Sequence, residues 1–463
     1  MRVAGGCGGG AEQGAEQDDA TGAGSAADRM RGVSTDQRAP GPVVGLPSQA
    51  GPGGRRWVAR VIYGLLGLEL AGVILFAALY NALDFRIYMW GGHAVLSDAR
   101  LYAAQAYGHW FTYSPFAAIV FVPVAALPLT LARVLWDLVS LAALAYCCVV
   151  TLRLTGYRPT RIVVAGVVVA AIALDPVYQT LFLGQINLIL LALILTDVWY
   201  VSRGRETGRW VGVGVGVAAA IKLTPAIFIV FFLLAGRVKA ALIAAGTFVS
   251  CCLIGFLVAP SASARYWVHL FYDTKRVGAP YISNQSPYGT AIRLAEGASH
   301  IGGWWLVVPA AFGAAGLAVS VVLARRGDWL GAATVTGTTG LLVSPISWAH
   351  HWVWILPALV LLVRAGKRVA AVIGYLVFAV APFWFTPHTG RPDEYGFHWL
   401  VTLVANCYLL AGLTFLGFMA WQALAADGRV PAAPVAGAPP GAGAPGTGAA
   451  GGAGVAGRTD PAG

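Results

Sequence analysis

Long apolar runs fill the middle of this chain and constrain its fold more than any other feature. The first of them, Val58 to Tyr80, is long enough to cross a bilayer core, which takes about 20 helical residues. Only 11% of the 463 residues are charged, against about 25% in soluble globular domains. Because a bilayer leaves backbone polar groups no water to bind, such runs must form helices. We therefore expect an all-α polytopic membrane protein, and a soluble globular enzyme is excluded.

The two ends of the chain differ in composition from the middle. Residues 1–54 and 427–463 are rich in Gly, Ala and Pro and have no apolar periodicity. Segments of this kind cannot bury enough apolar surface to fold. We predict a disordered N-terminal tail, a transmembrane domain over residues 55–426, and a disordered C-terminal tail.

The distribution of Lys and Arg predicts the topology through the positive-inside rule. Apolar candidates for spans fall near 58–80, 115–128, 131–152, 162–174, 185–201, 210–221, 224–236, 240–259, 304–324, 329–343, 350–363, 369–385 and 399–424. If Arg55, Arg56 and Arg60 are cytoplasmic, the alternating connections further along are basic as well. One of the segments 115–128 and 131–152 must then be re-entrant, and the shorter, Pro-bounded first one is the better candidate. We expect about twelve crossings of the cell membrane, with both tails cytoplasmic.

The net charge of +11 does not indicate nucleic-acid binding. The cations stand singly or in small groups between apolar runs and form no basic stripe interleaved with aromatic residues. Five of the six Cys residues lie inside apolar runs in no metal-ligand spacing, which predicts core packing. We expect no metal and no cofactor, and membrane lipids as surroundings.

Unusual polar residues gather on the connections that this topology places outside the membrane. Asp84 follows the first predicted span, with Arg86 and Tyr88 close behind it. An acid at a membrane surface is a suitable general base for a hydroxyl nucleophile. The alternative is an interfacial loop in which Asp84 pairs with Arg86 and the aromatic residues lie at headgroup depth.

Two further motifs flank predicted span ends. Gln185 and Asn187 open one span, where their amides could bind sugar hydroxyls or another helix. Lys222 stands at a helix break before Thr224-Pro225, between apolar segments. A buried ammonium there needs an anion, either a carboxylate such as Asp175 or a substrate phosphate. Snorkelling of Lys222 to the headgroups is the alternative.

The long external segment 260–303 and the start of a later span complete the set. The first combines aromatic residues with Lys275, Arg276, Asn284 and Gln285, a composition typical of carbohydrate sites and also of ordinary folded loops. At the span, Trp348 precedes the pair His350-His351. Adjacent side chains on a helix point about 100° apart, so the pair is weak as a metal site and favours proton handling, phosphate contact or packing.

Two acids inside predicted spans support a different class of protein. Glu69 and Asp197 are costly within a bilayer, and a proton-coupled transporter would use such groups. A transporter or lipid flippase would also show repeats with matching broken helices, and the sequence has no convincing repeat. We interpret both acids as structural.

The ordered set of motifs resembles the polyprenyl-phosphate-mannose-dependent mannosyltransferases of the GT-C superfold, the actinobacterial type that elongates phosphatidylinositol mannosides and related glycolipids. The matching stretches are Asp84 to Tyr88, Phe111 to Phe116, Gly184 to Asn187, Ala220 to Pro225, Asp273 to Gly278, Ser283 to Ser286 and Ser344 to Trp352. They occur in order, and the resemblance covers the membrane region, about residues 60–425. One departure is Ser114, where Pro is usual in the family.

The resemblance implies an inverting, metal-independent mannosyl transfer from a polyprenyl-phosphate donor to a glycolipid or lipoglycan acceptor on the external face. Asp84 would be the catalytic base. Donor phosphate or sugar would be bound by Arg86, Tyr88, Tyr113, Gln185, Asn187, Lys222, Lys275, Arg276, Asn284, Gln285, Trp348, His350 and His351. The same fold with a lipid-phosphate arabinose or glucose donor is the nearest alternative.

Overall fold

The structure is a computed structural model that describes residues 52–80, 82–204, 208–388 and 394–425. All of them belong to one compact unit. The predicted C-terminal tail lies outside the described residues, and of the predicted N-terminal tail only residues 52–54 are described, at the start of α1. In this part of the chain the regular elements are helices. Two isolated β-bridges, Ala106–His109 and Asn284–Trp348, pair single residues outside them. The prediction of an all-α protein is confirmed for these residues.

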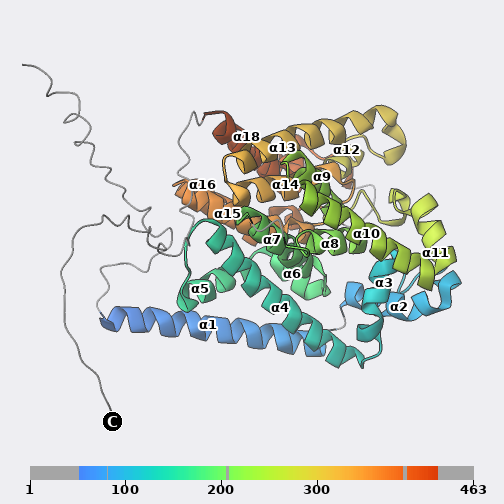
Figure 1. Cartoon of the computed structure of the whole chain (residues 1–463), viewed down its shortest axis with the longest axis horizontal. Coiled ribbons are helices and arrows are strands. Elements are labelled where there is room, and N and C mark those ends of the chain that lie inside the picture. The colour runs from blue at the N-terminus through green and yellow to red at the C-terminus, as the bar shows by residue number, and fades with distance from the viewer. Residues whose placement is uncertain (1–51, 81, 205–207, 389–393, 426–463) are drawn as a thin grey trace, which may run out of the picture. The chain divides into compact units, whose positions relative to one another are not determined.

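The helices follow one another along the chain as labelled in Figure 1. Their bounds are α1 Pro52–Leu79, α2 Leu83–Ala94, α3 Pro115–Ala125, α4 Leu129–Leu154, α5 Arg161–Ile172, α6 Asp175–Leu183, α7 Asn187–Ser202, α8 Val213–Ile221, α9 Ile227–Leu234, α10 Val238–Val258, α11 Pro260–Arg265, α12 Pro287–Leu294, α13 Val307–Arg325, α14 Trp329–Val343, α15 Ile355–Arg364, α16 Arg368–Val380, α17 Trp399–Ala405 and α18 Cys407–Ala425. Short 3-10 turns include η1 Val95–Arg100, η2 Thr224–Ala226 and η7 Ala349–Trp354.

Several helices are long and apolar enough to cross a membrane. Five described helices meet this condition, Gly54–Leu79, Leu129–Leu154, Val238–Val258, Gly303–Arg325 and Cys407–Ala425, and a sixth span results if the bent pair α5–α6 counts as one. The 26 residues of α4 would reach about 39 Å at 1.5 Å per residue. The chain is therefore a membrane protein. The number of about twelve crossings stays a prediction, because many of the expected spans are helices of only 10–17 residues.

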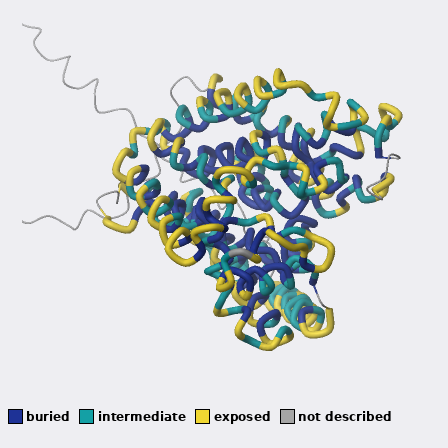
Figure 2. The backbone as a smooth tube through the Cα atoms, turned by 90° about the vertical axis from the view of Figure 1, so that its right-hand side faces the viewer, coloured by how far each residue is buried: buried dark blue, intermediate teal, exposed yellow. Residues whose placement is uncertain are grey.

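The helices expose apolar side chains on their outer faces, as membrane spans do. In α1, which contacts α4 and α5 (Figure 1), Leu68 is 71% exposed and Leu79 is 76% exposed. Figure 2 shows the buried segments where helices pack on one another and the exposed segments on the outer turns. In water such a surface would be unfavourable, and in a bilayer it faces lipid.

Two segments predicted as connections between spans fold into helices. The first is α2 with η1, so Asp84 lies in the first turn of a helix and not in an irregular loop. The second is α6, which meets α5 at an angle of 77°. Asp175-Pro176 at its start and Gly184 after its end are the residues that commonly begin and end a helix, so this signal was present in the sequence.

The described Cys residues are all free thiols, as their positions in apolar runs predicted. Asp197, one of the two acids inside apolar segments, accepts a hydrogen bond of 2.8 Å from the backbone amide of Val215 at the start of α8. This contact satisfies an amide that has no partner within its own helix. The structural interpretation of Asp197 therefore has a specific basis.

Candidate active site

Asp84 and Gln185 form the centre of the candidate site. Asp84 lies in the first turn of α2, and Gln185 stands in the turn between α6 and α7. Nε2 of Gln185 donates a hydrogen bond to Oδ2 of Asp84 at 2.5 Å. A carboxylate near the start of a helix also interacts favourably with the helix dipole. The fold thus joins two of the predicted site residues that lie 101 positions apart.

Two tyrosine hydroxyls fix the orientation of the Gln185 amide. Oε1 of Gln185 lies 2.6 Å from the hydroxyl of Tyr88 and 3.0 Å from that of Tyr113, and the two hydroxyls are 2.8 Å apart. A hydroxyl can donate to an amide oxygen but not to an amide nitrogen that already carries two hydrogens. The nitrogen of Gln185 is therefore directed at Asp84.

Burial dominates the electrostatics of Asp84. Desolvation raises the pKa of its carboxyl group above the usual value, while the hydrogen bond from Gln185 and the charges of His109 and Lys222 act in the opposite direction. A raised pKa makes the carboxylate a stronger base than a solvated one. This property suits a group that must remove a proton from a hydroxyl.

Lys222 lies at the break between α8 and η2, where its own backbone is extended. Its Nζ is 2.6 Å from Nε2 of His351 and 3.1 Å from Oδ1 of Asn187, and it lies 5.6 Å from the ring centre of Tyr113. None of these partners carries a negative charge. An ammonium held in this way has capacity left for an anion.

Asp175, the carboxylate suggested as a partner of Lys222, has other partners. It accepts hydrogen bonds from the hydroxyl of Tyr408 at 3.0 Å and from Nε1 of Trp384 at 3.1 Å. The suggested pairing with Lys222 is wrong, because the start of α6 directs Asp175 toward α18. The carboxylate whose charge acts on Lys222 is instead that of Asp84, and a substrate phosphate is the other anion considered for this ammonium.

The histidine pair splits into two different environments. When Lys222 is protonated its ammonium only donates, so Nε2 of His351 accepts and the proton of the neutral ring is on Nδ1. The ring of His350 lies 4.7 Å from that of His351. Its backbone oxygen accepts from Nδ2 of Asn187 at 2.9 Å, so the pair also holds the start of α7.

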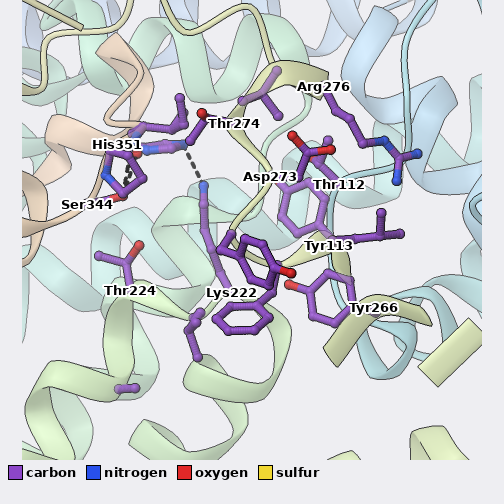
Figure 3. Close-up of a pocket in the computed structure, with 18 of the residues that line it drawn as sticks. Thr112, Tyr113, Lys222, Thr224, Tyr266, Asp273, Thr274, Arg276, Ser344 and His351 are labelled. Carbon is purple, nitrogen blue, oxygen red and sulfur yellow. Dashed lines mark hydrogen bonds between the residues drawn. The ribbon is translucent and has the colours of Figure 1, made fainter. Parts of the chain in front are cut away.

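A cavity of about 560 Å³ adjoins these residues (Figure 3). Five of the predicted site residues line it, namely Tyr113, Lys222, Arg276, Trp348 and His351. Figure 3 shows Lys222 and Arg276 on different sides of the cavity. The wall is mostly apolar and aromatic, with a few polar groups, which is the usual composition of a ligand site. Asp84 is not part of the wall and connects to it through Gln185 and Tyr113.

Four other predicted site residues do not line the cavity. Arg86 stacks on the ring of Tyr107 at 3.7 Å, and Lys275 is not part of the cavity wall. The side chains of Asn284 and Gln285 are fully buried. Both amide nitrogens bind backbone carbonyls, Asn284 those of residues 279 and 345 and Gln285 those of residues 282 and 405. These two amides thus connect segments of the chain.

The wall also contains residues that the sequence did not single out as ligands. Thr112, Thr224 and Ser344 belong to motifs already recognised, and their small hydroxyls beside charged or aromatic neighbours were the available signal. Tyr266 and Thr274 come from the long segment 260–303. In the described part of the chain no three His, Cys, Asp or Glu side chains are placed to hold a metal ion.

Comparisons with known proteins give consistent results. Glycosyltransferase family 87 matches residues 111–345. The polyprenol-phosphate-mannose-dependent alpha-(1-2)-phosphatidylinositol mannoside mannosyltransferase of Mycobacterium tuberculosis (strain ATCC 25618 / H37Rv) is 33% identical over 343 residues, which are 68% of this chain and 79% of that protein. The protein of the same name from Mycolicibacterium smegmatis is 35% identical over 365 residues, 72% of this chain and 79% of that protein.

A third relative covers more of the chain. The polyprenol-phosphate-mannose-dependent alpha-(1-2)-phosphatidylinositol pentamannoside mannosyltransferase of Mycobacterium tuberculosis (strain CDC 1551 / Oshkosh) is 32% identical over 421 residues, 86% of this chain and 94% of that protein. No solved structure matches the chain.

Proposed function

This chain belongs to glycosyltransferase family 87, and from this membership we propose that it moves a mannosyl residue from a polyprenyl-phosphate donor to a glycolipid acceptor of the phosphatidylinositol mannoside type. The chain is a membrane glycosyltransferase. The identity of its donor and of its acceptor is what we propose. Both are supported by the activities for which three relatives, 32–35% identical, are named.

One observation carries the chemical part of the proposal. Tyr113 lines the cavity, its hydroxyl contacts the amide that holds Asp84, and its ring lies against Lys222. A base and a cation are therefore joined through one residue of the cavity wall. Transfer from a sugar phosphate needs these two groups, one for the attacking hydroxyl and one for the leaving phosphate.

We infer a reaction in which Asp84 is the base. The carboxylate of Asp84 takes the proton of an acceptor hydroxyl while the hydroxyl oxygen attacks the anomeric carbon from the side opposite the phosphate. The bond between this carbon and the phosphate oxygen breaks, and the polyprenyl phosphate leaves with the electron pair. The anomeric configuration inverts. Protonated Asp84 then returns its proton to solvent.

Lys222 stabilises the negative charge that develops on the leaving phosphate. Asn187 and His351 hold its ammonium in place, since each provides an acceptor at hydrogen-bond distance. A phosphate monoester to the lipid is already a good leaving group, so neither a general acid nor a metal ion is required. We place the reaction on the external face, because the basic connections of the sequence mark the other face as cytoplasmic.

A donor and acceptor assay tests the proposal. The full chain, purified in detergent, is incubated with labelled polyprenyl-phosphate mannose and phosphatidylinositol mannosides of different mannose content, with and without a metal chelator. Polyprenyl-phosphate arabinose and glucose run in parallel. We expect mannosyl transfer that the chelator does not change. Transfer from arabinose or glucose donors alone, or loss of activity on chelation, would overturn the corresponding part of the proposal.

A further inference from the structure

Arg133 is a fully buried cation that the reaction described above does not use. It lies on α4 with 2% of its side chain exposed, and Asp137 one turn further along is 1% exposed. Nη2 of Arg133 is 3.0 Å from Oδ2 of Asp137. Both charges lie inside a long apolar helix, where a single charge would be very unfavourable and a pair is tolerated.

The guanidinium also binds the end of α6. Nη2 donates to the backbone oxygen of Leu181 and, at 3.3 Å, to that of Phe182. The last carbonyl groups of a helix have no partner within the helix, and a cation there is also favoured by the helix dipole. Arg133 therefore fixes the end of α6 on α4.

This end of α6 leads directly into the site. Gly184 follows it in the left-handed conformation, with φ of 69°, and the next residue is Gln185, the hydrogen-bond donor to Asp84. A Cβ atom at Gly184 would clash with Nη1 of Arg133 and lie 2.8 Å from Cβ of Phe85. Gly184 therefore packs directly between these two side chains.

The other half of the hydrogen-bonded pair lies against the same guanidinium. Phe85 is the residue after Asp84, and its ring centre is 5.7 Å from Cζ of Arg133. Arg133 thus touches the residue before Gln185 and the residue after Asp84. It lies behind the hydrogen bond between them, on the side of α4.

We propose that Arg133, neutralised by Asp137, is a positioning residue that sets the geometry of the Asp84–Gln185 hydrogen bond. This inference rests on the proposed role of Asp84 as the base. In this arrangement α4 serves as the rigid support against which the start of α2 and the end of α6 are aligned. Nη2 alone contacts the carboxylate of Asp137 and the two carbonyl groups of α6, while the rest of the planar guanidinium packs against Gly184 and Phe85.

The test replaces the charged pair by apolar residues of similar size, R133M/D137L, because removal of a complete buried pair is often tolerated by the fold. The matched control is R364M/D328N, which removes the Arg364–Asp328 pair, also 3.0 Å apart, between α15 and the start of α14. Asn at 328 can still accept the hydrogen bond from the amide of Gly331.

We expect R133M/D137L to fold with a lower melting temperature, because the carbonyl groups of Leu181 and Phe182 lose this donor. It should keep the KM for both substrates while kcat falls by about 100-fold, the effect of a misplaced reacting group. The control should keep wild-type kcat. In a D84N background the same double substitution should cause little further loss, because its effect passes through Asp84. The variant R133K keeps the charge but loses the planar group that packs on Gly184 and Phe85. It should show an intermediate kcat and covers the case in which the double variant does not fold.

Different outcomes address the inference and the function separately. The positioning role is overturned if R133M/D137L or R133K keeps the wild-type kcat. It is also overturned if the fold-loss of kcat from R133M/D137L is as large in the D84N background as in the wild type. An inactive wild-type protein in the mannosyl-transfer assay overturns the proposed function instead. If another donor sugar is used, the comparison of variants is made with that donor.

Discussion

The amide nitrogen of Gln185 lies 2.5 Å from the carboxylate of Asp84, and the two residues are contributed by the start of α2 and the turn after α6. Tyr88 and Tyr113 hold the other end of the amide. This relationship turns two separate sequence motifs into one unit. Most of the following predictions concern parts of that unit.

The first prediction concerns the base. Replacement of Asp84 by Asn keeps the shape of the side chain but removes its ability to take a proton, so transfer should fall by about 100-fold or more. The rate of mannosyl transfer by purified protein measures this effect. The control is D98N in η1, which alters a carboxylate that accepts hydrogen bonds from the backbone amides of Ser261 and Ala262 in α11. Near wild-type transfer by D84N would exclude Asp84 as the base.

The second prediction concerns the two hydroxyls that orient Gln185. In Y88F or Y113F one donor to Oε1 remains, whereas in Y88F/Y113F the amide can turn around. We expect the loss of kcat in the double variant to exceed the product of the single losses, as residues of one hydrogen-bond network are not additive. Losses that simply multiply would show that the hydroxyls act independently.

The third prediction concerns the cation at the helix break. K222M should weaken inhibition by free polyprenyl phosphate and lower kcat, because the developing phosphate charge loses its partner. K222R should retain part of the inhibition by polyprenyl phosphate and part of the wild-type kcat. H351A should mimic K222M only in part, since Asn187 still binds the ammonium. Equal inhibition of K222M and wild type by polyprenyl phosphate would place the phosphate elsewhere.

The fourth prediction is a pH profile. Burial raises the pKa of Asp84, and the hydrogen bond from Gln185 together with the charges of His109 and Lys222 limits the rise. A base works when deprotonated, so kcat/KM should fall as the pH decreases through this pKa, above the range of a solvated aspartate. In Q185A one lowering interaction is lost, and the acid limb should move to higher pH. A limb that moves to lower pH in Q185A would contradict the assignment.

The fifth prediction uses two glycines with left-handed backbone. G184A combines an unfavourable φ, which costs about 1–2 kcal/mol, with the clash against Arg133 and Phe85. G236A has a similar φ of 77° in the turn between α9 and α10 and no atom within 4 Å of the added methyl group. We expect G184A to lower the melting temperature more than G236A and to reduce transfer, whereas G236A keeps its activity. Equal effects on both measurements would show that backbone strain alone matters at Gly184.

Much of the architecture was predictable from the sequence, because it follows from local properties. Apolar length predicted the long helices α1, α4, α10, α13 and α18, since the bilayer requires backbone groups to bind within a helix. The same reasoning failed at residues 83–94 and 175–183, which were taken as connections and form α2 and α6. Both are too short to cross a membrane, so a search for spans passes over them.

The candidate site shows the same division. Sequence motifs predicted that Asp84, Gln185, Tyr113, Lys222 and His351 matter, because polar residues are costly in an apolar chain and need a reason. Only the tertiary structure decided which of them meet, since side-chain contacts across 101 residues depend on helix packing. It placed Asp175 against Tyr408 and not against Lys222. It directed the amides of Asn284 and Gln285 to backbone carbonyls, and it placed Arg133 behind the site. Composition determined that this protein lies in a bilayer, and helix packing decided which partners its few charged side chains have.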